Sequence, residues 1–95
     1  MSETTTTCSK FNTGPLYVTA GIERKLSTRV ILHALARHVT GDWGDLDEED
    51  CRANDESVRV GSRILSAYVD PHQTRFWIIT EADRSSTTIL LPEEY

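Results

Sequence analysis

Three short apolar runs near the C-terminal end limit the fold more than any other feature. "RILSAYVD" (63–70), "RFWIITE" (75–81) and "TTILLP" (87–92) are rich in β-branched and aromatic residues. The first two flank "DPHQ", where Asp70 can open a type I turn and Pro71 suits its second position. Pro92 ends the third run where no further ladder donor is needed. The pattern predicts an antiparallel β-meander.

Both faces of this meander carry apolar side chains. One face would present Leu65, Ala67, Val69, Trp77 and Ile79, and the other Ile64, Tyr68, Phe76 and Ile78. Alternation alone therefore leaves the inward face open. Helices could cover one face while the N-terminal segment or a second subunit covers the other, so a homodimer is one arrangement that we consider.

A helix is predicted over 27–41, "STRVILHALARHVTG". Ser27 or Thr28 is a suitable N-cap, and Gly41 a suitable C′ residue. The expected apolar stripe consists of Ile31, Leu35 and Val39, widened by Leu32, Ala34 and Ala36. A basic ridge on another side would consist of Arg29, His33 and Arg37. His33 and His38 are five residues apart, which does not suit paired metal ligands, and we expect both at the surface or boundary.

A second helix is predicted from Leu46 to Val60, ending at Gly61. Asp45 would cap it, with Glu48 completing a capping box. Its apolar side would be thin, comprising Leu46, Ala53 and Val60. Two i,i+4 ion pairs are expected, Glu48 with Arg52 and Asp55 with Arg59.

The predicted class is α+β, with two helices packed on a three- to four-stranded antiparallel β-meander. A length of 95 residues with 38% hydrophobic content supports one core. We expect a disordered tail over 1–10 and a single domain over 11–95, with a strand or extended segment in "GPLYVTAGI" (14–22). The chain shows neither a signal peptide nor a membrane-spanning run, and its two cysteines form no disulfide or zinc pattern. A cytoplasmic protein without membrane association is expected.

Negative charge is concentrated in "GDWGDLDEED" and the residues after it. The net charge of the chain is −5. Between 42 and 56 a single arginine stands against the carboxylates of Asp42, Asp45, Asp47, Glu48, Glu49, Asp50, Asp55 and Glu56. The rest of the chain is mildly basic, so the pattern predicts a polarised surface.

Three interpretations of this acidic segment are a metal loop, a helix start and a mimic of nucleic acid. Asp42, Asp45 and Asp47 do not reproduce the ligand spacing of an EF-hand, so neither a metal nor another cofactor is predicted. Helix capping accounts for part of the acidity. Trp43 is either an aromatic anchor for a partner or a core residue that fixes the turn between the helices.

The polar segment "EADRSSTT" (81–88) is the remaining place for chemistry. Asp83, Arg84, Ser85 and Ser86 could bind a phosphate or serve a small enzyme. The chain has no P-loop or G-x-S-x-G spacing, and Asp83 can instead accept hydrogen bonds within a turn while Arg84 stays exposed. We favour the turn and predict a protein that is not an enzyme.

"RHVTGDWGDLDEED", "RILSAY" and "WIITEADRSSTTILLPEEY" resemble a family of short bacterial proteins found on plasmids, phages and integrated elements, usually described as plasmid-related or uncharacterised. The resemblance extends over most of the chain from Phe11 onward. Some members are labelled as the modification subunit of type I restriction enzymes. That label does not fit here, because the chain has no Gly-rich cofactor loop and is too short for a methyltransferase domain. The resemblance implies residence on a mobile element, where small acidic proteins often disarm host defence.

The charge pattern and the resemblance lead to one hypothesis. Duplex DNA carries one charge per about 1.7 Å, and a helix from Glu48 to Glu56 would span about 12 Å with a comparable carboxylate density. We therefore expect an anti-CRISPR or antirestriction protein that inhibits a host nucleic-acid-binding complex. The expected partner-binding residues are Asp42, Trp43, Asp45, Asp47, Glu48, Glu49, Asp50, Asp55 and Glu56.

Two alternatives remain open. One is a small ligand-binding or enzymatic module that uses "EADRSSTT". The other is a small mobile-element regulatory protein that uses the basic ridge, although direct nucleic-acid binding is disfavoured at this net charge.

Overall fold

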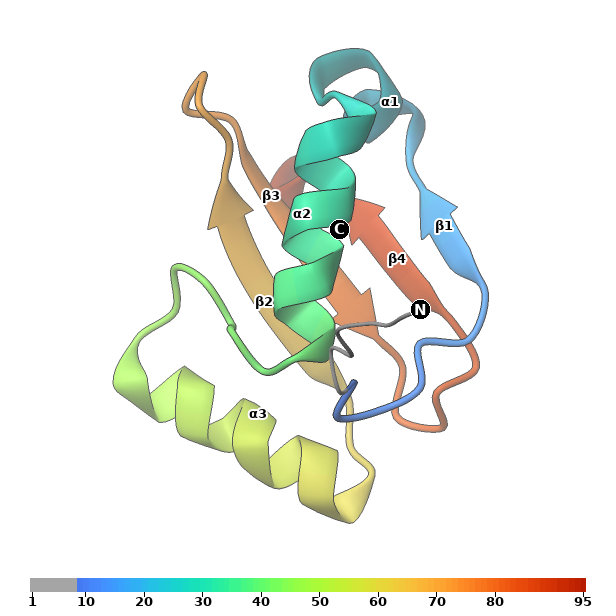
Figure 1. Cartoon of the computed structure of the whole chain (residues 1–95), viewed down its shortest axis with the longest axis vertical. Coiled ribbons are helices and arrows are strands. Elements are labelled where there is room, and N and C mark those ends of the chain that lie inside the picture. The colour runs from blue at the N-terminus through green and yellow to red at the C-terminus, as the bar shows by residue number, and fades with distance from the viewer. Residues whose placement is uncertain (1–8) are drawn as a thin grey trace, which may run out of the picture.

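The protein is an α+β domain in which helices pack on a four-stranded mixed sheet (Figure 1). The computed structural model describes residues 9–95, so most of the tail predicted over 1–10 lies outside the described residues. The elements are β1 (Leu16–Val18), α1 (Ala20–Lys25), α2 (Thr28–Val39), α3 (Glu48–Val60), β2 (Ile64–Val69), β3 (Arg75–Thr80), β4 (Thr87–Leu90) and the 3₁₀ turn η1 (Pro92–Glu94). The sheet order is β1-β4-β3-β2. In Figure 1, α2 crosses one face of the sheet and α3 lies near the start of β2.

The antiparallel meander of β2, β3 and β4 is confirmed. Asp70 opens the first turn, because the N–H of Gln73 donates to its carbonyl (2.9 Å) and its carboxylate accepts from the N–H groups of His72 and Thr74. The fourth strand differs from the prediction, since β1 pairs parallel with β4 and places Leu16 opposite Thr87. The sheet is therefore mixed rather than a pure meander.

Helix α1 lies partly within the segment predicted to be extended. Thr19 caps it by accepting from the N–H of Ile22 (3.3 Å). The Glu94 carboxylate, 75 residues away in sequence, accepts from the Thr19 hydroxyl (2.5 Å) and from the Gly21 N–H (3.2 Å). A Cβ on Gly21 would meet that carboxylate at 2.5 Å. Because the stabilising partner is so distant in sequence, the local pattern could not show this six-residue helix.

Helix α2 forms as predicted but is rotated relative to the predicted stripe. Ser27 is its N-cap, and Gly41 follows it with φ +87°. The fully buried residues are Ala34 and His38; Ile31, Leu35 and Val39 are half-buried, while Leu32 and Ala36 are exposed. Beneath α2 the sheet buries Ile64, Tyr68, Phe76, Ile78 and Ile89, which settles which face is inward. The opposite face is partly shielded, with Ala67 and Ile79 buried, Leu65 and Trp77 half-buried and Val69 exposed.

His38 is fully buried, so its predicted surface position is wrong. Its Nδ1 lies 2.6 Å from the Ser66 hydroxyl, and its Nε2 lies 2.8 Å from the Thr80 hydroxyl. Thr80 and Thr87 are joined at 2.7 Å, and the Thr87 hydroxyl donates to the Thr13 carbonyl (2.8 Å). One polar chain therefore connects α2, β2, β3, β4 and the segment before β1.

The direction of the last bond fixes every other proton in this chain. Thr87 uses its hydrogen on a carbonyl, so Thr80 must donate to Thr87 and its own oxygen must accept from Nε2–H of His38. The other ring nitrogen, Nδ1, then accepts from Ser66. A neutral Nε2–H imidazole satisfies each group, whereas an added proton on Nδ1 would require the Ser66 hydroxyl to turn its own hydrogen away and accept.

Helix α3 ends at Gly61 in the left-handed conformation (φ +81°), as predicted, but begins differently. Asp47, and not Asp45, is the N-cap, and its carboxylate accepts from the N–H of Asp50 (2.8 Å). The predicted apolar side is also wrong, because Ala53 and Val60 are exposed and Leu46 precedes the helix. Within residues 9–95, no helix has the length and apolar character needed to cross a membrane.

The buried imidazole makes stability depend on pH. Burial, and then the nearby Arg84 charge, lower the pKa of His38 from 6.5 to about 4. Between these values the unfolded chain binds a proton that the native state does not. The stability from neutral His38 is therefore complete above about pH 6.5 and decreases as the pH falls towards 4, by roughly 3 kcal/mol in total.

We expect urea unfolding to show this loss between pH 7.5 and 4.5 in the wild type. The variant His38→Gln keeps a donor and an acceptor but cannot titrate, so its free energy of unfolding should change less over the same interval. Equal pH dependence in both proteins would contradict the assignment.

Candidate functional site

The loop before α3 is held against the outer edge of β2. The N–H of Asp45 donates to the Ala67 carbonyl (2.7 Å), and the N–H of Ala67 donates to the Trp43 carbonyl (3.2 Å). Gly44 lies between these two bonds with φ +77°, and a Cβ there would come within 2.0 Å of the Ala67 oxygen. The glycine is therefore required by close backbone approach, which explains one feature of "GDWGDLDEED".

Trp43 is a core residue with 4% of its surface exposed. Its ring stacks on Phe11 with 6.2 Å between centroids and meets His38 edge-on at 5.9 Å. Its Nε1–H donates to Asp55 on α3 (2.9 Å). The indole therefore joins the core to α3 and is not displayed as a surface anchor.

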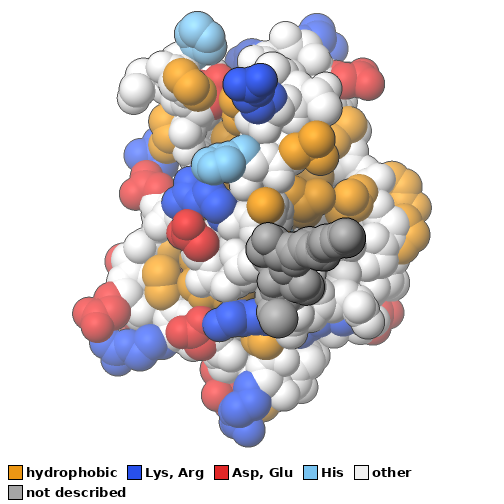
Figure 2. All heavy atoms as spheres, viewed as in Figure 1, with side chains coloured by type: hydrophobic (Ala, Val, Ile, Leu, Met, Phe, Trp, Pro, Cys, Tyr) orange, Lys and Arg blue, Asp and Glu red, His pale blue; other side chains and the backbone are white. Residues whose placement is uncertain are grey.

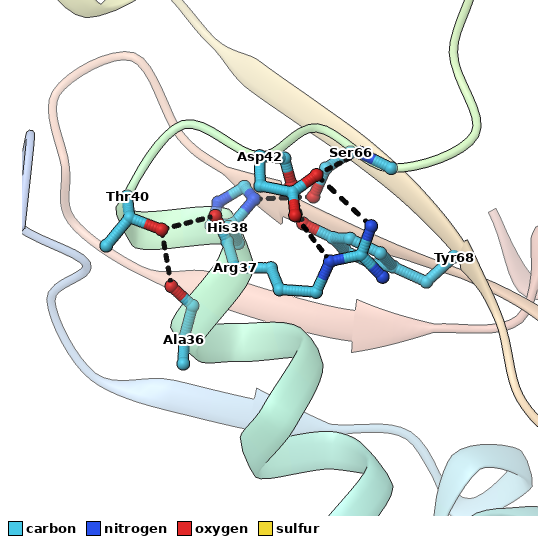
Figure 3. A network of polar contacts seen from close by, with 8 residues as sticks. Ala36, Arg37, His38, Thr40, Asp42, Ser66 and Tyr68 are labelled. Carbon is cyan, nitrogen blue, oxygen red and sulfur yellow. Dashed lines mark hydrogen bonds and ion pairs between the residues drawn. The ribbon is translucent and has the colours of Figure 1, made fainter.

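Asp42 is the most strongly held carboxylate of the acidic segment (Figure 3). The Arg37 guanidinium donates to both of its oxygens (2.7 and 3.1 Å) and lies 4.8 Å from the centre of the Tyr68 ring. This hydrogen-bonded pair lowers the pKa of Asp42. The Tyr68 hydroxyl donates to the Asp42 carbonyl (2.8 Å), so this residue is fixed through both its side chain and its backbone.

Three further carboxylates also have cationic partners. Arg75 on β3 pairs with Asp45 (3.0 Å). The predicted pair of Glu48 with Arg52 is present (3.1 Å). The predicted partner of Arg59 is wrong, because Arg59 pairs with Glu56 (2.5 Å) while Asp55 accepts from the indole of Trp43.

Uncompensated charge remains at the first turn of α3. Glu49 and Asp50 are exposed and form no ion pair with the described residues, and Asp47 is exposed while capping the helix. We call Asp47, Glu49 and Asp50 the acidic end of α3. Figure 2 shows red and blue side chains interspersed on this part of the molecule. Asp55, in the middle of the helix, also has no ion pair, but its carboxylate accepts from the Trp43 indole. Most of the unpaired negative charge thus lies at one end of the helix and does not form a phosphate-like row along it.

A polar side chain attaches α3 to the sheet. Among the residues of α3, all of which the structure describes, only Asn54 is buried. Its amide donates to the Leu65 carbonyl (2.7 Å) and its oxygen accepts from the Leu65 N–H (3.2 Å). The sequence signal for this contact was weak, because an asparagine in a charged helix is usually solvated.

The basic ridge of Arg29, His33 and Arg37 lines one groove, as its spacing suggests. The groove has a volume of about 470 Å³, and its apolar lining includes Val30, Tyr68 and Phe76. Arg37 is already paired with Asp42, whereas Arg29 and His33 form no ion pair with any residue of 9–95. Two of the three ridge residues are therefore free to meet an anion.

The polar side chains Asp83 and Arg84 of "EADRSSTT" form hydrogen bonds within the protein. Arg84 is half-buried, not exposed as expected, and its guanidinium donates to the carbonyls of Ser57, Ser62, Glu81 and Ala82. The Asp83 carboxylate accepts from the Ser85 N–H (3.0 Å). The turn thereby connects β3 and β4 to the end of α3.

Within residues 9–95, no cluster of three or more histidine, cysteine or carboxylate side chains is arranged to hold a metal ion. Searches of family models, curated proteins and solved structures found no match to this chain. Function is therefore inferred from the site alone, together with the sequence resemblance.

The hydrogen bonds between Asn54 and Leu65 should contribute measurably to the free energy of unfolding. Asn54→Ala would leave the N–H and carbonyl of Leu65 without partners, at a cost of about 1–3 kcal/mol. Urea unfolding should show this loss, and amide exchange should accelerate in α3. The control Arg52→Ala removes an exposed ion pair and should cost only about 0.2–1 kcal/mol. Similar effects for the two variants would contradict the role of Asn54.

Proposed function

We propose that this protein is a non-enzymatic counter-defence protein of a phage or plasmid that inhibits a host CRISPR or restriction nuclease complex. The acidic end of α3 would contact a basic nucleic-acid-binding surface of that complex. The observation that carries this proposal is the position of the unpaired charge: Glu49 and Asp50 lie exposed on a helix that contributes little to the core.

The way in which α3 is attached to the domain supports a role in presenting its carboxylates to a partner. A 13-residue helix that buries one polar side chain adds little hydrophobic stabilisation. It is nevertheless held in place at defined points, by Asn54 on Leu65 and by Asp55 on the Trp43 indole. A rigid acidic surface loses little conformational freedom on binding, which favours affinity.

The ion pairs within the protein indicate which carboxylates can contact a partner. Asp42, Asp45, Glu48 and Glu56 have arginine partners, and Asp55 accepts a hydrogen bond from the Trp43 indole. Within 42–56, the exposed carboxylates without a partner on another side chain are therefore those of the acidic end. A compact cluster suits a group of lysines and arginines at one point of a nucleic-acid channel. Steering by such charges should be sensitive to salt.

Neutralising the acidic end provides the test. We expect Glu49→Gln with Asp50→Asn to reduce capture of the nuclease complex from host lysate at least tenfold, and to abolish inhibition of DNA cleavage by that complex. Asp47 is left unchanged, because its replacement would remove the helix cap. Duplex DNA should compete with the wild type for the captured complex.

The matched control is Glu23→Gln with Glu93→Gln, which removes two exposed carboxylates elsewhere. This control should bind like the wild type. Equal loss in both double variants would indicate a net-charge effect, and unchanged capture by the α3 variant would contradict the proposed site.

A second candidate, a small regulatory protein that contacts nucleic acid, is favoured by Arg29, which lines the groove beside His33 and forms no ion pair with the described residues. Arg29→Ala with His33→Ala should then weaken binding to labelled duplex DNA, and the wild-type affinity should decrease steeply between about 50 and 200 mM salt. Arg37 is a poor target because it fixes Asp42. Salt-independent binding, or none, would remove this candidate.

A further inference from the structure

Strand β1 is an exposed sheet edge composed only of large apolar residues. Leu16, Tyr17 and Val18 are 49, 56 and 42% exposed. β1 is the last strand on its side of the sheet, with no described element beyond it in Figure 1. Figure 2 shows hydrophobic side chains at the margin where β1 runs. Charged side chains are one device that prevents such an edge from pairing with another chain, and β1 carries none.

The backbone groups that face outward can be identified from the ladder with β4. The Pro15 carbonyl accepts from the Thr87 N–H (3.0 Å), and the Thr19 N–H donates to the Ile89 carbonyl (3.1 Å). In a parallel ladder, alternate residues bond to the same neighbour, so Tyr17 also bonds inward. The N–H and carbonyl groups of Leu16 and Val18 therefore point away from the sheet.

We propose that a second copy of this chain occupies the edge, with β1 of each copy paired antiparallel about a two-fold axis through Tyr17. Leu16 of one copy then lies opposite Val18 of the other, and each such pair exchanges two backbone hydrogen bonds. All outward groups of β1 become satisfied, and the two sheets join into one continuous sheet. This is an isologous contact, which closes as a dimer.

Other symmetric registers satisfy fewer groups. An axis through Leu16 would place Val18 opposite Gly14, whose φ of +66° is not extended. An axis through Val18 would place Leu16 opposite Ala20, where α1 begins. The Tyr17 register is therefore the one in which every outward group of the strand meets an extended partner.

The side chains match the same register. Leu16 and Val18 are in register with Thr87 and Ile89, so they lie on the face covered by α2, whereas Tyr17 lies on the opposite face with Thr88. Across the axis Leu16 would pack on Val18, and the two Tyr17 rings would meet. Apolar and aromatic cross-strand pairs of this type are stabilising. A three-residue strand gives a small interface, so the dimer should depend on concentration.

Cysteine scanning tests the register. Directly opposed residues that are not hydrogen-bonded to each other have Cα atoms about 4.5 Å apart, within disulfide range. In a background of Cys8→Ser and Cys51→Ser, Tyr17→Cys should therefore cross-link in a glutathione redox buffer. The two copies of residue 16, or of residue 18, would be about 8 Å apart, beyond that range. Leu16→Cys and Val18→Cys should cross-link at least tenfold more slowly. Equal rates at the three positions would overturn the proposal.

Sedimentation equilibrium with the native cysteines gives an independent result. The wild type should change from monomer to dimer between about 10 µM and 1 mM. Tyr17→Lys places two cations on the axis and should remain monomeric, whereas Val60→Lys, at an exposed site on α3, should dimerise like the wild type. A wild type that stays monomeric, or a Tyr17→Lys variant that still dimerises, would overturn the proposal.

Discussion

The buried hydrogen-bond chain through His38 is the interaction on which the rest of the structure depends. It connects α2 to three strands and to the segment before β1. Phe11 and Trp43 cover the imidazole, and Trp43 in turn holds Asp55 of α3. Contacts therefore run continuously from the centre of the domain to its most charged helix. Removing one partner would leave buried polar groups unsatisfied, which costs more than the lost bond alone.

Patterns that depend on neighbours in sequence predicted the fold well. The meander, its Asp70 turn, the Ser27 cap of α2 and the Gly61 end of α3 are all present. Features that depend on distant partners were missed. β1 pairs with a strand about 70 residues away, and α1 is held by Glu94. His38 was misplaced because its environment requires hydroxyls from three separate strands.

The ion pairs of the acidic segment also depend on residues that are distant in sequence, so the sequence alone did not predict its free charge. Residues 42–56 contain a single arginine. In the folded protein, however, Arg37 pairs with Asp42 and Arg75 pairs with Asp45, and both arginines lie outside that segment. Asp45 is bonded through its N–H to Ala67 of β2 and through its carboxylate to Arg75. Asp47 therefore caps α3 in its place. The sequence therefore located the acidic element correctly and overestimated its free charge. Exposed pairs of this kind contribute little stability, about 0.2–1 kcal/mol each, so their main effect is to shape the field.

The protonation of His38 is the most direct test of this account. Long-range ¹⁵N–¹H correlation spectra at pH 5.5 report the charge and tautomer of a histidine ring. The hydrogen-bond chain predicts a neutral ring with its proton on Nε2, because the pKa of His38 is lowered to about 4. An imidazolium at that pH, or a neutral ring protonated on Nδ1, would contradict the proposed chain of donors.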